Sequence, residues 1–286
     1  MATTGPPFAS SISTAPHKAV RLRETPQVPW AHGFPVLLPQ FAPRCLVNVD
    51  ALKKQIVLFD LTADEGAAGI TVAKTEQTPV TTALSADGDS LCIGGTRGGL
   101  WIFDTAALLA AAAAGQAGEP IELVRPRAQN ARPLGGAVSG AAFSEAGDRL
   151  FATCVSSAVT VHDAQQDGLP ILRTLPSIAP PSFYEHNYLA CVGGLLAACT
   201  GKPVAANDFA GRDVVVWRVD EHGEETHLHT LGTFESSSTS VAIRHDGEQI
   251  AVGLQDGKVM VFSTAVLSGG GTAELVVEVA PPQALV

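Results

Sequence analysis

The chain has 286 residues, 46% of them hydrophobic, and a formal net charge of −10 with only 18 lysines and arginines. A chain of this length and hydrophobicity can bury a sizeable core. The acidic balance argues against nucleic acid or an anionic membrane surface as the main partner. Because no run of about 18 uncharged apolar residues occurs, the sequence excludes a transmembrane helix.

The N-terminus and the cysteines bear on localisation. The first 23 residues contain no acidic residue and no apolar signal segment, so we expect a disordered tail, with a transit peptide as the alternative. The five cysteines form no CxxC pair, and four fall in apolar, strand-like segments. They are predicted to be buried thiols rather than disulfides, which favours a reducing, cytoplasmic location and leaves organellar import as the alternative.

The first part of the chain predicts several short strands. Alternating apolar and charged residues at 19–24 favour an exposed strand, and a proline-rich loop follows it. Further strands are predicted at residues 36–40, 45–49, 55–60 and 70–74.

Residues 80–104 contain the clearest pattern. Strands are predicted at 80–85, 91–95 and 100–104, separated by turns at Asp87-Gly88 and Gly98-Gly99. Asp104 or Thr105 is expected to cap a short helix through the alanine run to Gly115, and residues 121–124 are expected to form a fourth strand.

This pattern repeats. Residues 83–104, 142–163 and 242–263 align over 22 positions without a gap, and the later two have outer strands at 171–175 and 275–280. Another copy ends at Trp217, with strands predicted at 214–219 and 228–231, residues 204–208 near its second strand, and an irregular insertion at 178–194 before it.

The repeat spacing predicts the architecture. Strand-end residues recur at intervals of 44, 59, 55 and 45, namely Phe59, Phe103, His162, Trp217 and Phe262. Each unit supplies four short strands whose nearly continuous apolar runs are typical of sheets covered on both faces. We therefore predict an all-β fold, a β-propeller of four-stranded antiparallel blades with about five recognisable blades, incomplete or closed by the N-terminal strand. Residues 1–35 and 281–286 are the expected tails, and residues 36–280 are the expected propeller.

At these residues the chain resembles the WD-repeat β-propeller family. The pairs Phe59-Asp60, Phe103-Asp104 and His162-Asp163 stand where that family has Trp-Asp, and Asp256-Gly257 is similar to its turn before the third strand. The copies lack the family's Gly-His pair ahead of the first strand. The segments GGTRGGLWIFD and GLQDGKVMVF are loosely similar to those of actin-interacting WD-repeat proteins.

Motifs that would carry enzymatic chemistry are missing from the sequence. It has no phosphate-binding loop, no dinucleotide-binding glycine motif and no Gly-x-Ser-x-Gly elbow. The strongest metal candidate is a His/Glu cluster made of Glu221, His222, Glu224, Glu225, His227 and His229. An exposed turn leading into a charged outer strand is the favoured interpretation, so no catalytic, cofactor-binding or metal-binding residue is predicted.

The resemblance and the missing motifs together favour a non-enzymatic scaffold that binds other proteins within a larger assembly. Its predicted contact residues are the aromatic and polar side chains Phe183, Tyr184, His186 and Tyr188, because such side chains are enriched at the cores of interfaces. No cofactor, nucleic acid or membrane is expected. Alternatives are a small-ligand or catalytic site in the central channel and, more weakly, an actin-associated or phosphoinositide-binding propeller.

Overall fold

The structure is a computed structural model, and its description concerns the compact unit formed by Ala31–Val286. Within that unit it describes residues 33–38, 45–60, 69–154, 157–175, 189–200, 213–220, 225–231, 234–236, 238–265 and 274–279. No helix among these residues is long and apolar enough to cross a membrane. The predicted strand at residues 19–24 lies outside the described residues.

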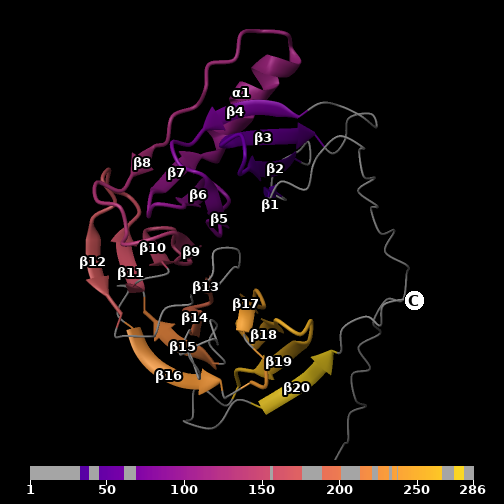
Figure 1. Cartoon of the computed structure of the whole chain (residues 1–286), viewed down its shortest axis with the longest axis vertical. Helices are drawn as coiled ribbons and strands as arrows, with labels where there is room; N and C mark the ends of the chain where they lie inside the picture. The colour runs from indigo at the N-terminus through magenta and orange to yellow at the C-terminus, as the bar shows by residue number, and fades with distance from the viewer. Residues whose placement is uncertain are drawn as a thin grey trace, which may run out of the picture. The chain divides into compact units, whose positions relative to one another are not determined.

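The described part of the chain forms five antiparallel sheets, each built from four consecutive strands (Figure 1). The first sheet contains β1 (Gly33–Leu38), β2 (Cys45–Asp50), β3 (Gln55–Asp60) and β4 (Ile70–Lys74). The second contains β5 (Pro79–Leu84), β6 (Ser90–Gly95), β7 (Leu100–Asp104) and β8 (Ala128–Gln129). The third contains β9 (Val138–Phe143), β10 (Arg149–Cys154), β11 (Ser157–Asp163) and β12 (Ile171–Thr174).

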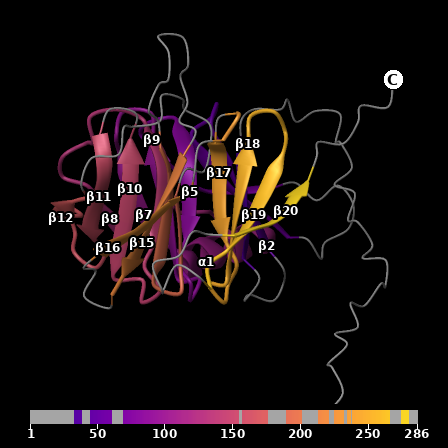
Figure 2. The ribbon, with the colours of Figure 1, turned by 90° about the horizontal axis from the view of Figure 1, so that it is seen from below.

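The fourth sheet contains β13 (Leu189–Val192), β14 (Leu195–Thr200), β15 (Asp213–Val219) and β16 (Glu225–Leu231). The fifth contains β17 (Ser238–Ile243), β18 (Gln249–Leu254), β19 (Val259–Ser263) and β20 (Glu274–Val279). Figure 2 shows these strands running along a common direction, so that the hairpin turns gather at two ends of the sheets. The prediction of repeated, four-stranded antiparallel sheets is confirmed.

The turn between the first and second strands is built in the same way in three sheets. The turn begins at a serine or an arginine, and its fourth residue is a glycine with positive φ. In the second sheet this glycine is Gly88, at φ 77°. The Gly88 N–H donates to the Ser85 carbonyl at 2.9 Å, and Gly147 and Gly247 repeat this bond in the third and fifth sheets. Only glycine takes this conformation without steric cost, which explains why Asp-Gly marks the turn in the sequence.

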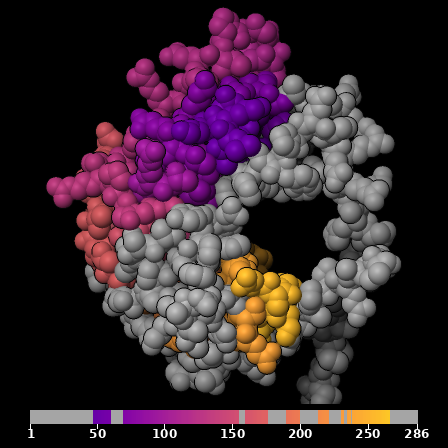
Figure 3. All heavy atoms as spheres, in the orientation of Figure 1, coloured from indigo at the N-terminus to yellow at the C-terminus, as the bar shows by residue number. Residues whose placement is uncertain are grey.

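Successive sheets pack against each other in chain order. The first strands are in contact as β1 with β5, β5 with β9, β9 with β13 and β13 with β17. Four apolar clusters fill the spaces between neighbouring sheets, with Trp101 and Phe103 in the first and Trp217 in the third. In Figure 3 the colours of neighbouring parts of the surface change from indigo to salmon in the order in which the sheets follow one another along the chain.

Burial differs between the inner sheets and the last one. Five of the six residues in β6 and in β10 are buried, and so are all six in β9, because both faces of those sheets are covered. In β18 buried residues alternate with half-buried ones, which indicates that only one face of the fifth sheet is covered.

A helix, α1 (Thr105–Gln116), follows the second sheet's third strand, as predicted. Residues 121–124 were predicted as the fourth strand of this sheet, and this is wrong, since β8 fills that place. Val124 instead forms a parallel bridge with Ala73 of the first sheet, and its N–H donates to the Val72 carbonyl at 2.8 Å. The apolar run therefore covers the edge of the neighbouring sheet.

Two further predictions for the fourth sheet need correction. Residues 178–194 were expected to be irregular, but Leu189–Val192 forms strand β13. Residues 204–208 were expected near the second strand, whereas that strand is β14, in which Leu196 is opposite Trp217. The predicted strand at 36–40 is also shifted, because β1 begins at Gly33 and ends at Leu38, before Pro39.

Candidate functional site

The first strands of four sheets line a recess in the described part of the chain. Its volume is about 750 Å³, and its walls come from β5, β9, β13 and β17. Most lining side chains are small or aliphatic, such as Ala141, Ala190 and Val241. We call this recess the central groove.

The polar groups of the central groove lie where the first strands end. Glu145 and His245 are exposed and line the groove beside Ser144 and Gly193. Ala86 stands at the equivalent position of the second sheet, because each of the three residues directly follows the first residue of the same turn. The backbone hydrogen bond of the turn is therefore the same in the three sheets, whereas the residue at this position is alanine, glutamate or histidine.

A second recess of about 430 Å³ adjoins this end, between the third and fourth sheets. It is lined by Glu145, Asp148 and Arg149 from one sheet, and by Gly193-Gly194 and Asp220 from the other. Cys191 also borders both recesses. We call the turn residues Ala86, Glu145, Gly193 and His245, which border the groove, the groove rim.

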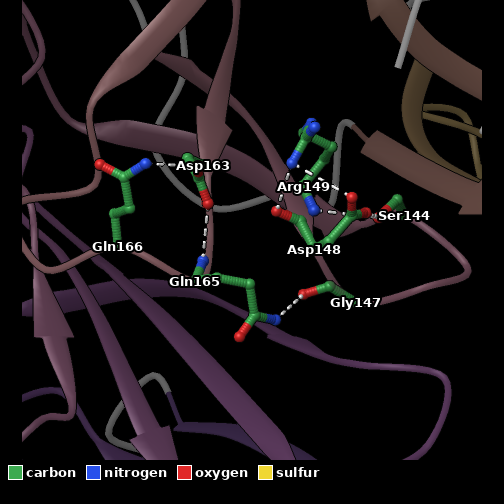
Figure 4. Close-up of polar contacts among 7 residues, drawn as sticks. All are labelled: Ser144, Gly147, Asp148, Arg149, Asp163, Gln165 and Gln166. Atoms are coloured by element: carbon green, nitrogen blue, oxygen red, sulfur yellow. Dashed lines mark hydrogen bonds and ion pairs between the residues drawn. The ribbon is translucent and has the colours of Figure 1, made fainter. Parts of the chain in front are cut away.

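The polar groups of the third sheet's turn are held by one another (Figure 4). The Ser144 hydroxyl donates to Asp148 Oδ1 at 2.9 Å and accepts the Arg149 backbone N–H at 3.0 Å. Asp148 Oδ2 lies 3.1 Å from Arg149 Nη1. The serine hydroxyl proton is thus used within the turn, and this arrangement positions backbone rather than activating a nucleophile.

The end of β11 is held in a similar manner, as Figure 4 also shows. Asp163 accepts the Gln165 backbone N–H and the Gln166 side-chain amide, both at 3.0 Å. The Gln165 side chain donates to the Gly147 carbonyl at 3.2 Å and so joins this segment to the turn. Asp163 therefore stabilises a turn, and it does not pair with the adjacent His162.

His162 is fully buried, at 0% exposure. Its Nδ1 lies 2.8 Å from the Leu169 carbonyl, and its Nε2 lies 2.9 Å from the Thr160 hydroxyl. Burial lowers the pKa of His162, and the hydrogen bond to Leu169 raises it by less. His162 is therefore a buried, neutral imidazole whose contacts with the Leu169 carbonyl and the Thr160 hydroxyl stabilise the third sheet.

The thiols of Cys92, Cys191 and Cys199 are not poised for nucleophilic chemistry. Burial raises the pKa of Cys191 to about 12, and the nearby Glu145 charge adds to this. Burial also raises the pKa of Cys199 to about 12 and that of Cys92 still further. These groups stay protonated at neutral pH. The prediction of buried thiols is confirmed for Cys92, Cys154 and Cys199, whereas Cys191 is only partly buried.

Several site predictions fall outside what the structure describes. The predicted partner-contact residues Phe183, Tyr184, His186 and Tyr188 lie outside the described residues. Of the metal candidates, Glu221, His222 and Glu224 also lie outside them, and Glu225, His227 and His229 are described only as backbone of β16. Within the described ranges, no group of three or more His, Cys, Asp or Glu side chains is placed to hold a metal ion.

Sequence reasoning missed the groove rim. The neighbouring Asp246 does not pair with His245 but accepts from the Arg244 guanidinium, with Arg244 Nε 2.7 Å from Asp246 Oδ1. The repeat alignment contained the signal, since Glu145 and His245 occupy one column, two positions before the glycine that all three turns share. Neither protein-family models nor curated proteins give a match to this chain. In the ranges that the structure describes, the geometry defines five small antiparallel sheets and one helix.

Proposed function

We propose that the chain is a WD-repeat-like β-propeller whose groove rim binds other proteins, so that it acts as a non-enzymatic scaffold in a larger assembly. The observation that carries this proposal is the groove rim itself. Three sheets present the same hydrogen-bonded turn toward the groove, and within that turn the residue facing the groove changes from Ala86 to Glu145 to His245. A constant frame with a variable contact position is suited to recognition.

The chemistry of the rim supports binding over catalysis. Glu145 and His245 are separate and exposed, the serine of the adjoining turn is committed to Asp148, and the Cys191 thiol is held protonated. A general acid–base pair or an activated nucleophile needs partners within hydrogen-bond reach, and the described groove residues do not supply such a set.

The alternative is a small apolar ligand in the central groove. The groove volume of about 750 Å³ and its aliphatic walls favour this alternative, since ligand pockets of similar size are mostly apolar. A small apolar ligand would contact the aliphatic walls, whereas the scaffold proposal concerns the exposed rim residues Glu145 and His245, so the two hypotheses respond to different substitutions.

The test is a quantitative capture experiment with full-length tagged protein in native extract. The double variant Glu145→Arg/His245→Glu reverses charge at the groove rim, and Glu119→Arg changes an exposed acid beyond α1 as the matched control. We expect a stoichiometric protein partner that the wild type and the control retain and the double variant loses. Recovery of the chain without a partner, or retention by the double variant, contradicts the scaffold proposal. A melting temperature equal to that of the wild type confirms that the double variant is folded.

A further inference from the structure

Each sheet has two faces with different roles. We define the forward face as the one that packs on the next sheet in the chain and the backward face as the one that packs on the preceding sheet. In the fourth sheet, Ala197 and Val216 belong to the cluster shared with the fifth sheet, while Leu196 and Trp217 belong to the cluster shared with the third. Cross-strand register places Ala197 opposite Val216 and Leu196 opposite Trp217.

The same register defines the forward pair in every sheet. Forward pairs are Val47/Leu58, Cys92/Ile102, Phe151/Val161, Ala197/Val216 and Ala251/Val261. In the first four sheets all eight members are at most 3% exposed. In the fifth sheet both Ala251 and Val261 are only half-buried. The forward face of the fifth sheet therefore carries the residue types of a covered face but is only partly covered.

The backward pairs show the mirror-image pattern. They are Leu46/Phe59, Leu91/Phe103, Leu150/His162, Leu196/Trp217 and Ile250/Phe262. In the second to fifth sheets, the member on the third strand is at most 7% exposed against the preceding sheet. Phe59 of the first sheet is only half-buried. The chain thus carries both halves of one repeated interface, and each half is left incompletely covered at one end of the stack.

The exposed residues around these pairs agree with this conclusion. Ser240, Ala242 and Val259 of the fifth sheet's forward face are exposed, Val259 at 37%. Asn48, Gln55 and Val57 of the first sheet's backward face are half-buried. Val259 is exposed where its equivalents Leu100 and Val159 are fully buried, and an exposed apolar residue at such a position marks an interaction surface.

Exposed lysines lie near the first sheet's backward face, and acidic groups, together with Lys258, lie near the fifth sheet's forward face. The turn between β2 and β3 carries exposed Lys53 and Lys54, and the equivalent turn of the fifth sheet carries exposed Asp256. Glu235, 93% exposed at its side chain, lies 3.8 Å from Lys258 Nζ beside that turn. Equivalent turns lie at the same end of neighbouring sheets, so packing the fifth sheet on a first sheet brings lysines toward acidic groups.

We propose that the forward face of the fifth sheet binds the backward face of the first sheet of a second copy of this chain. The contact is head-to-tail, so the two copies contribute different surfaces. A second copy is the favoured occupant because it supplies the matching face, whereas in the structure the key residues of these two faces, such as Phe59 and Val261, are only half-buried. The surfaces are distinct from the groove rim, so this proposal and the scaffold proposal can fail separately.

A complementation experiment tests it. Ala251→Arg places a charge on the forward face of the fifth sheet, and Asn48→Arg places one on the backward face of the first sheet. Light scattering coupled to size exclusion should show wild-type mass rising with concentration and each variant at the mass of one chain, with association weakened at least about tenfold. An equimolar mixture of the two variants should form a dimer and stop there, because one intact face of each kind remains.

Other outcomes overturn the proposal. A wild-type protein that stays at the mass of one chain at all concentrations contradicts it. So does a variant mixture that fails to dimerise, and so does a single variant that still dimerises, because that result indicates a like-with-like contact. If either variant is unfolded by circular dichroism, Ser240→Arg and Gln55→Arg replace it on the same two faces, and Glu119→Arg is the control that should associate like the wild type.

Discussion

His162 is fully buried, and both of its ring nitrogens have a hydrogen-bond partner. The Leu169 carbonyl can only accept a hydrogen bond, so His162 Nδ1 carries the proton and Nε2 of the neutral ring is an acceptor. The Thr160 hydroxyl lies 2.9 Å from Nε2 and 3.1 Å from the Ala152 carbonyl, and it has one proton for these two acceptors. The sequence shows a histidine where the other copies have Phe or Trp, but it does not show this network, because Leu169 comes from the following loop.

We predict that His162 makes stability fall in mild acid. Its pKa in the folded protein is lowered from the ordinary value of 6.5, so the unfolded chain takes up a proton first as pH falls. Stability from the neutral ring is present above pH 6.5 and is lost as pH falls below it toward the folded pKa, with a limiting slope of about 1.4 kcal/mol per pH unit.

Urea unfolding at pH 7.5 and pH 5 checks this. His162→Phe, which places in the third sheet the residue type found at 103 and 262, should lose this part of the pH dependence. The quantity compared is the change in the free energy of unfolding between pH 5 and pH 7.5 within each protein, because the variant also loses the His162 hydrogen bonds. Equal pH dependence in the two proteins would show that His162 does not titrate as we infer.

At the scale of elements, sequence predicts what is specified locally and fails where pairing is specified by a neighbour. The helix start was predicted because Asp104 is an N-cap residue, and its carboxylate accepts from the backbone N–H groups of Ala106 and Ala107 at 2.9 and 3.2 Å. The two-residue strand β8 was missed. Its position is set by pairing with Trp101 and Ile102 rather than by a pattern of its own.

The cap provides a direct test. Asp104→Ala removes the acceptor for two N–H groups at the start of α1, and it should reduce the free energy of unfolding by about 1 kcal/mol. Asp104→Ser keeps a capping oxygen and should retain most of that stability. Chemical denaturation of the three proteins measures the difference, and equal losses for Ala and Ser would mean that capping is not what Asp104 contributes.

The turn between β6 and β7 is a second element that can be tested, because its geometry at residue 98 favours glycine. Gly98 has φ 79°, and a Cβ there would lie 2.1 Å from the Leu134 carbonyl oxygen. Gly118 has nearly the same φ, 77°, but has no atom within 4 Å of such a Cβ. Both alanine variants incur left-handed strain of about 1–2 kcal/mol, and Gly98→Ala should cost about 1–3 kcal/mol more because it also displaces backbone. Similar melting temperatures for the two variants would contradict this.

At the scale of the whole molecule, gapless repeats predicted three sheets well and the fourth poorly, for a physical reason. The second, third and fifth sheets join their first two strands by turns of the same length, so their sequences align. In the fourth sheet, Gly193 and Gly194 with φ 57° and 72° form a two-residue turn between β13 and β14. Because that turn is shorter, β13 falls out of register with the other copies and resembles the end of an insertion.

The stack also predicts where the protein opens first. A sheet covered on two faces loses two interfaces when it opens, while a terminal sheet loses one, so opening should begin at the ends of the stack. Amide hydrogen exchange followed by mass spectrometry should therefore show faster exchange in β18 and β19 than in β6 and β10 at low protein concentration. Uniform protection across the five sheets would contradict the one-sided packing inferred from burial.

Varying the protein concentration separates protection by packing within one chain from protection by a second copy. If the fifth sheet's forward face binds a second copy, raising the concentration should slow exchange in β18 and β19 of one chain and in β2 and β3 of the other, and leave β10 unchanged. In Ala251→Arg this concentration dependence should disappear while the low-concentration pattern remains. Protection at the ends that is high from the start and independent of concentration would instead mean that the first and fifth sheets cover each other within one chain.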